Sequence, residues 1–358
     1  MSATYVYVSN ADDGDIGVYS LQPDGRLRAM ARAAAVKPVM PLAVSPDRRF
    51  LYAAIRSKPF SVFAYAIDAR SGSLGKVSTA PLPESYPYIS TDRTGRFLFG
   101  ASYGGDLVGV HPIEGGGRLG EAQQVIPVGR NAHCILVDHG NRYVFASMLG
   151  TDQVFQFVFD ASTGRLAANT PPVLQLEAGT GPRHMAFSSD NRFLYVLSEL
   201  LGTVTTLALD AGSGQLSEVG SVSMLPPDTA LRPGMPRGGV GSPAASQAPR
   251  DTANDIWASD LRLTPDNRFL YAAERTGSTL AWLGRDAVSG KLTRLGSIPT
   301  EKQPRGIAID PTGKYLVASG EKSDTISVYA IGSEGAPAFL DRYPSGKGSN
   351  WVEIVATE

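Results

Sequence analysis

Short runs of apolar residues alternate with tight polar turns along the whole chain, and one pattern returns six times. In each copy an apolar run ends in a turn of small and polar residues, after which a basic and an aromatic residue begin a second run. The aromatic markers are Phe50, Phe97, Tyr143, Phe193, Phe269 and Tyr315. Successive markers are 46 to 50 residues apart, except for one interval of 76 residues. A period in the forties built from short strands is typical of the blades of a β-propeller.

The two chain ends supply a seventh copy of the pattern. Residues 4–10 align with the second run of each copy and place Tyr5 45 residues before Phe50, but no strand precedes them. Residues 351–355 form an apolar run that has no successor. Pairing these two segments closes the ring and removes exposed sheet edges. We therefore predict an all-β fold, a seven-bladed β-propeller that forms one domain over residues 1–358, with the N- and C-terminal segments sharing one blade.

The interval of 76 residues contains an insertion of about 30 residues, at about 226–255. It is rich in Pro, Gly, Ala and Ser, a composition that favours a flexible surface loop. The insertion connects an outer strand to the next inner strand, so we expect it at the end of the ring where the inner strands begin. A lid over that end is the alternative interpretation.

Candidate chemistry appears when the repeats are superimposed. In a four-stranded blade the inner strand begins where the second strand ends, so residues nine and ten before each marker and six after it should meet at one end of the ring. These positions collect Arg56, Tyr103, His133, Arg183, His184, Glu199, Asp260, Arg275, Arg305 and Glu321. Four crowded guanidinium groups repel one another unless anions offset them. The cluster therefore predicts a binding site for a small anionic molecule.

Composition and charge exclude several other functions. The formal net charge of −1 argues against a surface for nucleic acid, and no charged-then-apolar leader or long apolar run indicates export or a membrane. We expect a cytoplasmic protein, a monomer or weak homo-oligomer. Cys134 is the single cysteine, so no internal disulfide forms. Cys134 and the adjacent His133 face opposite ways on a strand, which favours a buried structural thiol. No metal or cofactor is expected, because no two-His motif has metal-ligand spacing.

Five segments resemble the bacterial propeller-type 6-phosphogluconolactonases: GPRHMAF (181–187), LYVLSEL (194–200), ASDLRLTPDNRFLYAAERT (258–276), QPRGIAIDPTGKYLVASG (303–320) and NWVEIV (350–355). The resemblance covers nearly the whole chain. The same family includes the fungal enzyme that cyclises 3-carboxy-cis,cis-muconate and relatives that act on sugar-acid lactones. The resemblance implies functional roles for His133, Arg183, Glu199 and Arg275. The chain departs from the family in the length of its insertion and in having Gly near Tyr103 where Asn is expected.

A lactonase needs a water nucleophile, a base that deprotonates the water, and groups that stabilise the oxyanion. Either Glu199 or His133 could be the base, if its surroundings tune its pKa. Arg183 and Arg275 would bind the substrate and stabilise the oxyanion. The remaining residues of the cluster are expected to bind substrate, with Arg56, Tyr103 and Arg305 holding its distal phosphate or carboxylate.

The first candidate substrate is 6-phosphogluconolactone, an anionic sugar lactone. Three alternatives stay open at this point. A lactone of an aldaric acid would replace the phosphate by a carboxylate, and cycloisomerisation of a carboxymuconate would be a different reaction. A non-catalytic propeller scaffold is the least favoured, because converging Arg, His and Glu residues do not suit a protein-binding surface.

Overall fold

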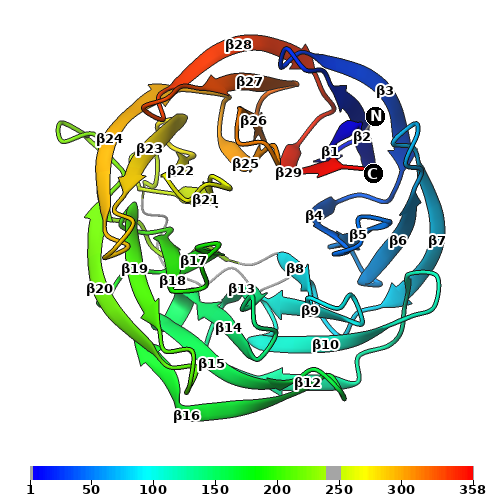
Figure 1. Ribbon diagram of the computed structural model, residues 1–358, viewed down its shortest axis with the longest axis horizontal. Helices are drawn as coiled ribbons and strands as arrows, with labels where there is room; N and C mark the ends of the chain where they lie inside the picture. Colours follow the sequence, from blue (N-terminus) through cyan, green and yellow to red (C-terminus); the bar gives the residue numbers. More distant parts are fainter. Residues whose placement is uncertain (1–2, 239–250, 358) are drawn as a thin grey trace.

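The computed structural model describes residues 3–238 and 251–357. Within these ranges the apolar runs form 29 strands, and one 3-10 helix, η1 (Leu149–Thr151), interrupts them. The strands make seven antiparallel sheets arranged as a ring around a central axis (Figure 1). The predicted seven-bladed propeller is therefore confirmed. No helix in the described residues is long and apolar enough to cross a membrane.

Each sheet stands with one strand near the axis and three more strands outward. The inner strands are β4 (Val39–Val44), β8 (Tyr88–Thr91), β13 (Ala132–Val137), β17 (Pro182–Phe187), β21 (Ala258–Leu263), β25 (Pro304–Ile309) and β29 (Ser349–Ala356). The second strands are β1 (Thr4–Asn10), β5 (Phe50–Ile55), β9 (Phe97–Ser102), β14 (Tyr143–Met148), β18 (Phe193–Ser198), β22 (Phe269–Glu274) and β26 (Tyr315–Gly320). We call the end of the ring where the inner strands begin the upper end, and the opposite end the lower end.

The third strand of each sheet is still largely buried, whereas the outer strand is the most exposed. The third strands are β2 (Asp15–Leu21), β6 (Ser61–Ile67), β10 (Leu107–Glu114), β15 (Gln153–Asp160), β19 (Thr203–Leu209), β23 (Thr279–Arg285) and β27 (Thr325–Ile331). The outer strands are β3 (Leu27–Ala34), β7 (Leu74–Pro81), β12 (Gln124–Pro127), β16 (Arg165–Gln175), β20 (Leu216–Ser223), β24 (Leu292–Pro299) and β28 (Pro337–Pro344). A two-residue strand, β11 (Arg118–Leu119), also pairs with β10.

The chain ends close the ring as the sequence predicts. Strand β29 pairs antiparallel with β1, with a register that runs from Thr4 opposite Ala356 to Ser9 opposite Trp351. The two termini consequently lie side by side in one blade (Figure 1). The inner strand of this blade comes from the C-terminal end of the chain and its other three strands from the N-terminal end.

The aromatic markers lock each blade to the next. Each marker ring covers a glycine in the outer hairpin of the neighbouring blade, and a Cβ atom added to that glycine would lie 2.1 to 2.6 Å from the ring. The pairs are Tyr5–Gly72, Phe50–Gly117, Phe97–Gly164, Tyr143–Gly214, Phe193–Gly290, Phe269–Gly335 and Tyr315–Gly25. The last pair joins the blade before the closing blade to the closing blade itself. The repeat in the sequence is thus the interface between blades.

The lower end carries one turn in six copies. The residue five before each marker accepts a hydrogen bond from the marker's backbone N–H, at 2.7 to 3.0 Å. These acceptors are Ser45, Asp92, Asp138, Ser188, Thr264 and Asp310. The side-chain oxygen satisfies a backbone donor that the tight turn leaves unpaired.

Candidate active site

The candidate residues reach the upper end by two routes. Arg56, Tyr103, Glu199, Arg275 and Glu321 each follow directly on the last residue of a second strand. His133, Arg183 and Arg305 lie one residue inside an inner strand. The antiparallel pairing of inner and second strands brings the two groups together, as the superimposed repeats predict.

Bulges in the inner strands aim three of these side chains. The register shifts between Ala132 and Cys134 in β13, between Pro182 and Met185 in β17, and between Pro304 and Gly306 in β25. A bulge leaves a residue out of the ladder and redirects its side chain. His133, Arg183 and Arg305 occupy these bulges. Alternation along a strand would not by itself place them at one point.

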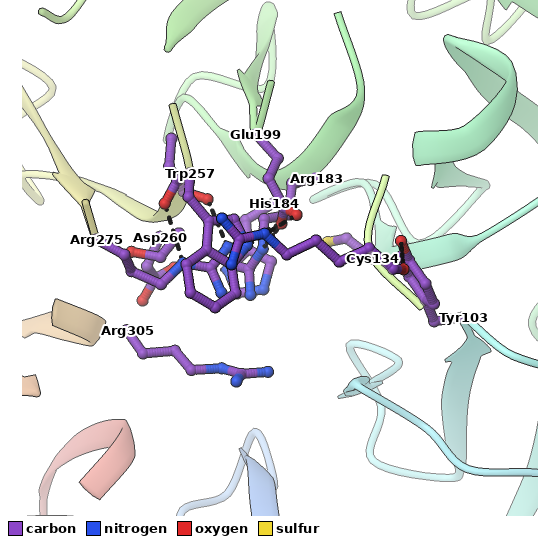
Figure 2. A network of polar contacts seen from close by, with 12 residues as sticks. Tyr103, Cys134, Arg183, His184, Glu199, Trp257, Asp260, Arg275 and Arg305 are labelled. Atoms are coloured by element: carbon purple, nitrogen blue, oxygen red, sulfur yellow. Dashed lines mark hydrogen bonds and ion pairs between the residues drawn. The ribbon is translucent and has the colours of Figure 1, made fainter. Parts of the chain in front are cut away.

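A cavity of about 320 Å³ lies at the upper end of the axis. Eight of the ten predicted site residues line it: Arg56, Tyr103, His133, Arg183, Glu199, Arg275, Arg305 and Glu321. The side chains come from six different sheets, so an intact ring is needed to assemble the site. Figure 2 shows several of them converging on one space.

Glu199 is the centre of a buried ion cluster. Its Oε2 lies 2.6 Å from Arg183 Nε and accepts a hydrogen bond from Arg275 Nη2 at 3.0 Å. Its Oε1 accepts a hydrogen bond from Trp257 Nε1 at 3.1 Å (Figure 2). All four residues lie at the wall of the cavity, and both arginines are at most 2% exposed. The Glu199 carboxylate therefore lies between two guanidinium groups and an indole N–H, and each of these groups is a donor.

The arginines differ in how they are neutralised. Arg305 forms an ion pair with Glu321. Burial acts against ionisation of Glu321, but Arg305 and Arg275 lower its pKa below the usual value. Arg56 instead donates hydrogen bonds to Ser85 Oγ at 2.9 Å and to Met40 Sδ. Burial, with Arg305 and Arg183 nearby, lowers the pKa of Arg56 to about 9.

His133 is a neutral imidazole in a cationic setting. Burial, followed by the charge of Arg183, lowers its pKa well below the usual value. The ring is 5% exposed and lies edge-on to Tyr103, with ring centroids 5.9 Å apart. Its Nδ1 is buried and has no hydrogen-bond partner among the described residues. A neutral imidazole can accept a proton at neutral pH, whereas a charged one cannot.

The prediction that His184 and Asp260 line the cavity is wrong. Both are 1% exposed and lie beneath it, where His184 Nδ1 and Asp260 Oδ1 are 2.7 Å apart. Strand alternation turns His184 away from the cavity that its neighbour Arg183 lines. Asp260 lies in a strand that does not reach the cavity at all, since the preceding residue, Ser259, is also buried away from it. The same alternation hides Cys134 beside His133, as predicted. Burial raises the pKa of the Cys134 thiol to about 12.

Comparison with known proteins gives the family. A profile described as "Lactonase, 7-bladed beta-propeller" matches residues 4–354. The chain belongs to this lactonase family. The 6-phosphogluconolactonase of Pectobacterium carotovorum is 36% identical over 354 residues, covering 99% of both chains. The 6-phosphogluconolactonase of Cronobacter sakazakii is 36% identical over 352 residues, covering 98% of both chains. The protein is therefore a lactone-opening hydrolase, and the predicted enzyme class is confirmed against the non-catalytic scaffold.

A solved structure supports the same assignment. The periplasmic gluconolactonase of Pseudomonas aeruginosa superimposes on this lactonase with a TM-score of 0.86, at 25% identity. The alignment covers 99% of this chain and 100% of that structure. The predicted resemblance to the propeller-type lactonases is thus confirmed over the full length.

The ten predicted site residues do not include every residue of the cavity wall of this lactonase, and Asp12, Trp257 and Arg237 are among those left out. Trp257 precedes β21 by one residue and stands twelve before its marker, a position where Pro38 also lines the cavity. An aromatic residue at that position was an available signal. Arg237 belongs to the insertion and has no counterpart in other blades, so the repeat gives no signal for it. Residues 239–250 of the predicted insertion lie outside the described residues.

No group of three or more His, Cys, Asp or Glu side chains is placed to hold a metal ion, as far as the described residues go. The cavity wall carries an imidazole, carboxylates, a phenol and guanidinium groups, and the chemistry below is built from these.

Proposed function

We propose that this lactonase hydrolyses 6-phosphogluconolactone, a six-carbon sugar lactone that carries a dianionic phosphate. The observation that carries the proposal is the charge of the cavity wall. Its described residues include five arginines and three acidic residues: Arg56, Arg183, Arg237, Arg275 and Arg305 against Asp12, Glu199 and Glu321. With His133 neutral, the wall has a surplus of two positive charges, which a dianion balances. The names of the two relatives at 36% identity support the same substrate.

We assign the role of general base to His133. Glu199 is less suited to it, because both of its oxygens are already engaged: Oε2 pairs with Arg183 and accepts from Arg275, and Oε1 accepts from Trp257. The buried nitrogen of His133 is Nδ1, which leaves Nε2 as the atom that faces the cavity. Glu199 in this proposal holds the two guanidinium groups in position.

The reaction then follows from the arrangement. Water attacks the carbonyl carbon of the lactone, and its proton passes to His133 Nε2 as the new C–O bond forms. The carbonyl oxygen becomes an oxyanion, which Arg183 and Arg275 stabilise. When the bond from this carbon to the ring oxygen breaks, the imidazolium returns the proton to the ring oxygen. The open product is a carboxylic acid, which ionises and releases one proton per turnover.

The layer beneath the cavity supports this role of His133. Asp260 accepts hydrogen bonds from Arg262, from the backbone N–H of Leu261 and Ile307, and from His184 Nδ1. Burial raises the pKa of Asp260, but these four donors favour its ionised form. Burial lowers the pKa of His184 well below the usual value, so its ring is neutral and carries one proton. That proton is on Nδ1, which donates to Asp260.

This chain of contacts sets the tautomer of His133. His184 Nε2 and His133 Nδ1 are both buried without a partner in the described residues, and the two ring centroids are 5.3 Å apart. We propose that His133 donates its Nδ1 proton toward His184 Nε2, directly or through one water molecule. The lone pair of a neutral imidazole is then on the other nitrogen, Nε2, where the mechanism needs it.

The experiment is a panel of lactones followed by proton release. The panel holds 6-phosphogluconolactone, neutral gluconolactone and a lactone of glucaric acid. We expect the largest kcat/KM for the phosphorylated lactone. His133→Asn should lower kcat on it by about 100-fold to 10,000-fold, the usual contribution of a general base. The matched control is His139→Asn, because His139 is exposed and does not line the cavity.

Two results would contradict the proposal. A higher kcat/KM for the glucaric lactone than for the phosphorylated lactone would assign the surplus charge to a carboxylate. Unchanged kcat in His133→Asn would remove His133 as the base and leave Glu199 as the other predicted candidate.

A further inference from the structure

The described part of the insertion is anchored over the upper end at several points. The backbone N–H of Arg232 donates to Asn254 O at 2.9 Å, and that of Gly234 donates to Leu200 O at 2.8 Å. From another sheet, Tyr103 Oη donates to Arg237 O at 2.8 Å. These bonds bring one side chain of the insertion, that of Arg237, to the cavity wall.

Arg237 is stacked on the aromatic residue that holds Glu199. Its Cζ lies 3.7 Å from the ring centroid of Trp257, and Cζ of Arg275 lies 3.6 Å from the same centroid. Two planar guanidinium groups this close to one centroid must lie on opposite faces of the indole. The indole is therefore held between a cation of the buried cluster and a cation of the insertion. A guanidinium that stacks by its face keeps its N–H groups directed outward from its edge.

The charge of Arg237 has no acidic partner in the part of the chain that the structure describes. Arg183 and Arg275 share Glu199, and Arg305 has Glu321. Among the five arginines of the wall, Arg56 and Arg237 are the two without an ion pair in residues 3–238 and 251–357. The surplus charge of the cavity thus comes from one residue of the repeat and one of the insertion.

We propose that Arg237 binds the phosphate of the substrate and makes the insertion a determinant of specificity for phosphorylated lactones. The inference rests on the proposed function and adds a contact that the repeat does not contain. The edge of a stacked guanidinium presents paired N–H donors, which match two oxygens of a phosphate. The stacking on Trp257 fixes the plane of the donor group before the substrate arrives, which reduces the entropy lost on binding.

The test is Arg237→Gln, with kcat and KM measured on 6-phosphogluconolactone and on neutral gluconolactone. Loss of one charge-assisted contact should raise KM for the phosphorylated lactone by about tenfold to a hundredfold, with kcat changed less than about threefold. The KM for neutral gluconolactone should not change. Arg237→Lys should recover part of the loss, because it keeps the charge without the stacked plane. Calorimetry should show the same selective loss for the product 6-phosphogluconate against gluconate.

Arg130→Gln is the matched control. Arg130 is an exposed arginine in the segment that leads into β13, at the same end of the ring, and it does not line the cavity. The Arg130→Gln variant loses the same positive charge as Arg237→Gln, so it measures the long-range effect of net charge on KM. The proposal requires a much larger effect from Arg237→Gln than from this variant.

Two outcomes would overturn the inference. If Arg237→Gln leaves both KM values unchanged, Arg237 makes no contact with the substrate. If both substrates lose activity alike, Arg237 only supports Trp257 and gives no specificity for phosphate. Failure of the proposed function is distinguishable, because it shows in the wild-type protein: the unaltered lactonase would then open neutral or dicarboxylate lactones in preference to the phosphorylated one.

Discussion

The two ends of the propeller axis use the same inner strands for different purposes. At the lower end, six blades place a Ser, Thr or Asp oxygen against the N–H of the marker aromatic. At the upper end, the six equivalent positions ten before the markers hold Met40, Pro87, His133, Arg183, Ser259 and Arg305. Every blade must close the same turn, but one cavity needs a different group from each blade. Repetition therefore marks structure in this chain, and departure from it marks chemistry.

The two ends also differ in what they contribute to stability. The lower turns satisfy backbone donors with neutral or single acidic acceptors, each worth a modest amount. The upper end holds buried charges that are stable only as a set, because each depends on the others for compensation. Substitutions at the upper end should consequently lower both stability and activity, whereas substitutions at the lower end should lower stability alone.

The largest effect is expected from Glu199→Gln at the upper end. It leaves the guanidinium groups of Arg183 and Arg275 buried around a neutral amide. Breaking a buried charge set in this way should lower the free energy of unfolding by about 3 to 5 kcal/mol. We also expect kcat/KM to fall by about 100-fold, because the two arginines lose their positions. Chemical denaturation and the proton-release assay measure the two effects.

A double variant is the control for this prediction. Adding Arg183→Met to Glu199→Gln removes the excess buried charge and should restore most of the stability. Activity should stay low, because one oxyanion donor is then missing. Equal stability of the single and the double variant would mean that the charge of Glu199 does not offset the buried charges of Arg183 and Arg275.

The next effect concerns the lower end. Asp92 accepts hydrogen bonds from the backbone N–H of Thr94, Arg96 and Phe97, and also from Asn141 Nδ2 in the next blade. Asp92→Ala leaves these donors without an acceptor and should lower the free energy of unfolding by about 2 to 3 kcal/mol. The kcat/KM of the folded enzyme should not change, because the cavity is at the opposite end.

The chain itself offers the control for Asp92. Serine performs the same turn at two equivalent positions, Ser45 and Ser188. Asp92→Ser should therefore cost less than about 1 kcal/mol, since it keeps the acceptor for Phe97. A loss of activity in either variant at a permissive temperature would break the separation between the two ends.

The fold was predictable because its essential contacts repeat. The marker aromatics that define the period are the residues that cover the hairpin glycines of the next blade, so their spacing reports the blade interface directly. The closing blade followed from the same frame, as the pairing of Tyr5 with Val355 shows. The end of the ring at which the site lies followed from strand direction. Eight of the ten predicted residues line one cavity for that reason.

What the sequence could not show depends on bulges and on the insertion. The bulges in β13, β17 and β25 decide which of two adjacent residues faces the cavity. The residue types at these positions do not predict a bulge. His184 was misplaced because it points away from the cavity that its neighbour Arg183 lines, and Asp260 because β21 contributes no residue to the cavity wall. Arg237 lay outside the repeat, so its position needed coordinates.

A smaller effect is expected in the pH dependence of stability. Burial holds the pKa of His184 well below the value near 6.5 of an unfolded chain. Below pH 6.5 the unfolded chain therefore binds a proton that the folded protein does not, and the free energy of unfolding falls as the pH falls. Each such histidine contributes a slope of up to about 1.4 kcal/mol per pH unit. His184→Asn should reduce the mean slope between pH 6.5 and 5.5 by about 1 kcal/mol per pH unit, because the unfolded histidine is only half protonated at pH 6.5.

Denaturant unfolding at several pH values measures this slope, whatever the stability of the variant at pH 7. The control is His139→Asn at the lower end, where the side chain is exposed and the slope should change less. If the two variants have the same slope, the histidines at the two ends bind protons equally well in the folded protein. The upper end would then not be more strongly buried than the lower end as far as these histidines show.

The smallest effect tests the one blade whose lower turn departs from the others. Arg48, two residues before its marker, has φ of 59°, where the equivalent residues are Gly95, Asn141, Asn191, Asn267 and Gly313. Gly and Asn tolerate this left-handed region better than Arg does. Arg48→Asn should therefore raise the free energy of unfolding by about 0.5 kcal/mol, reduced by loss of an exposed hydrogen bond to Ala356 O. Arg48→Ala also removes the arginine side chain, but alanine does not tolerate the left-handed region as asparagine does, so this variant should not raise the free energy of unfolding. If both variants shift the denaturation midpoint alike, the backbone conformation is not the cause. The lower end would then not owe its repeated residues to the geometry of its turn.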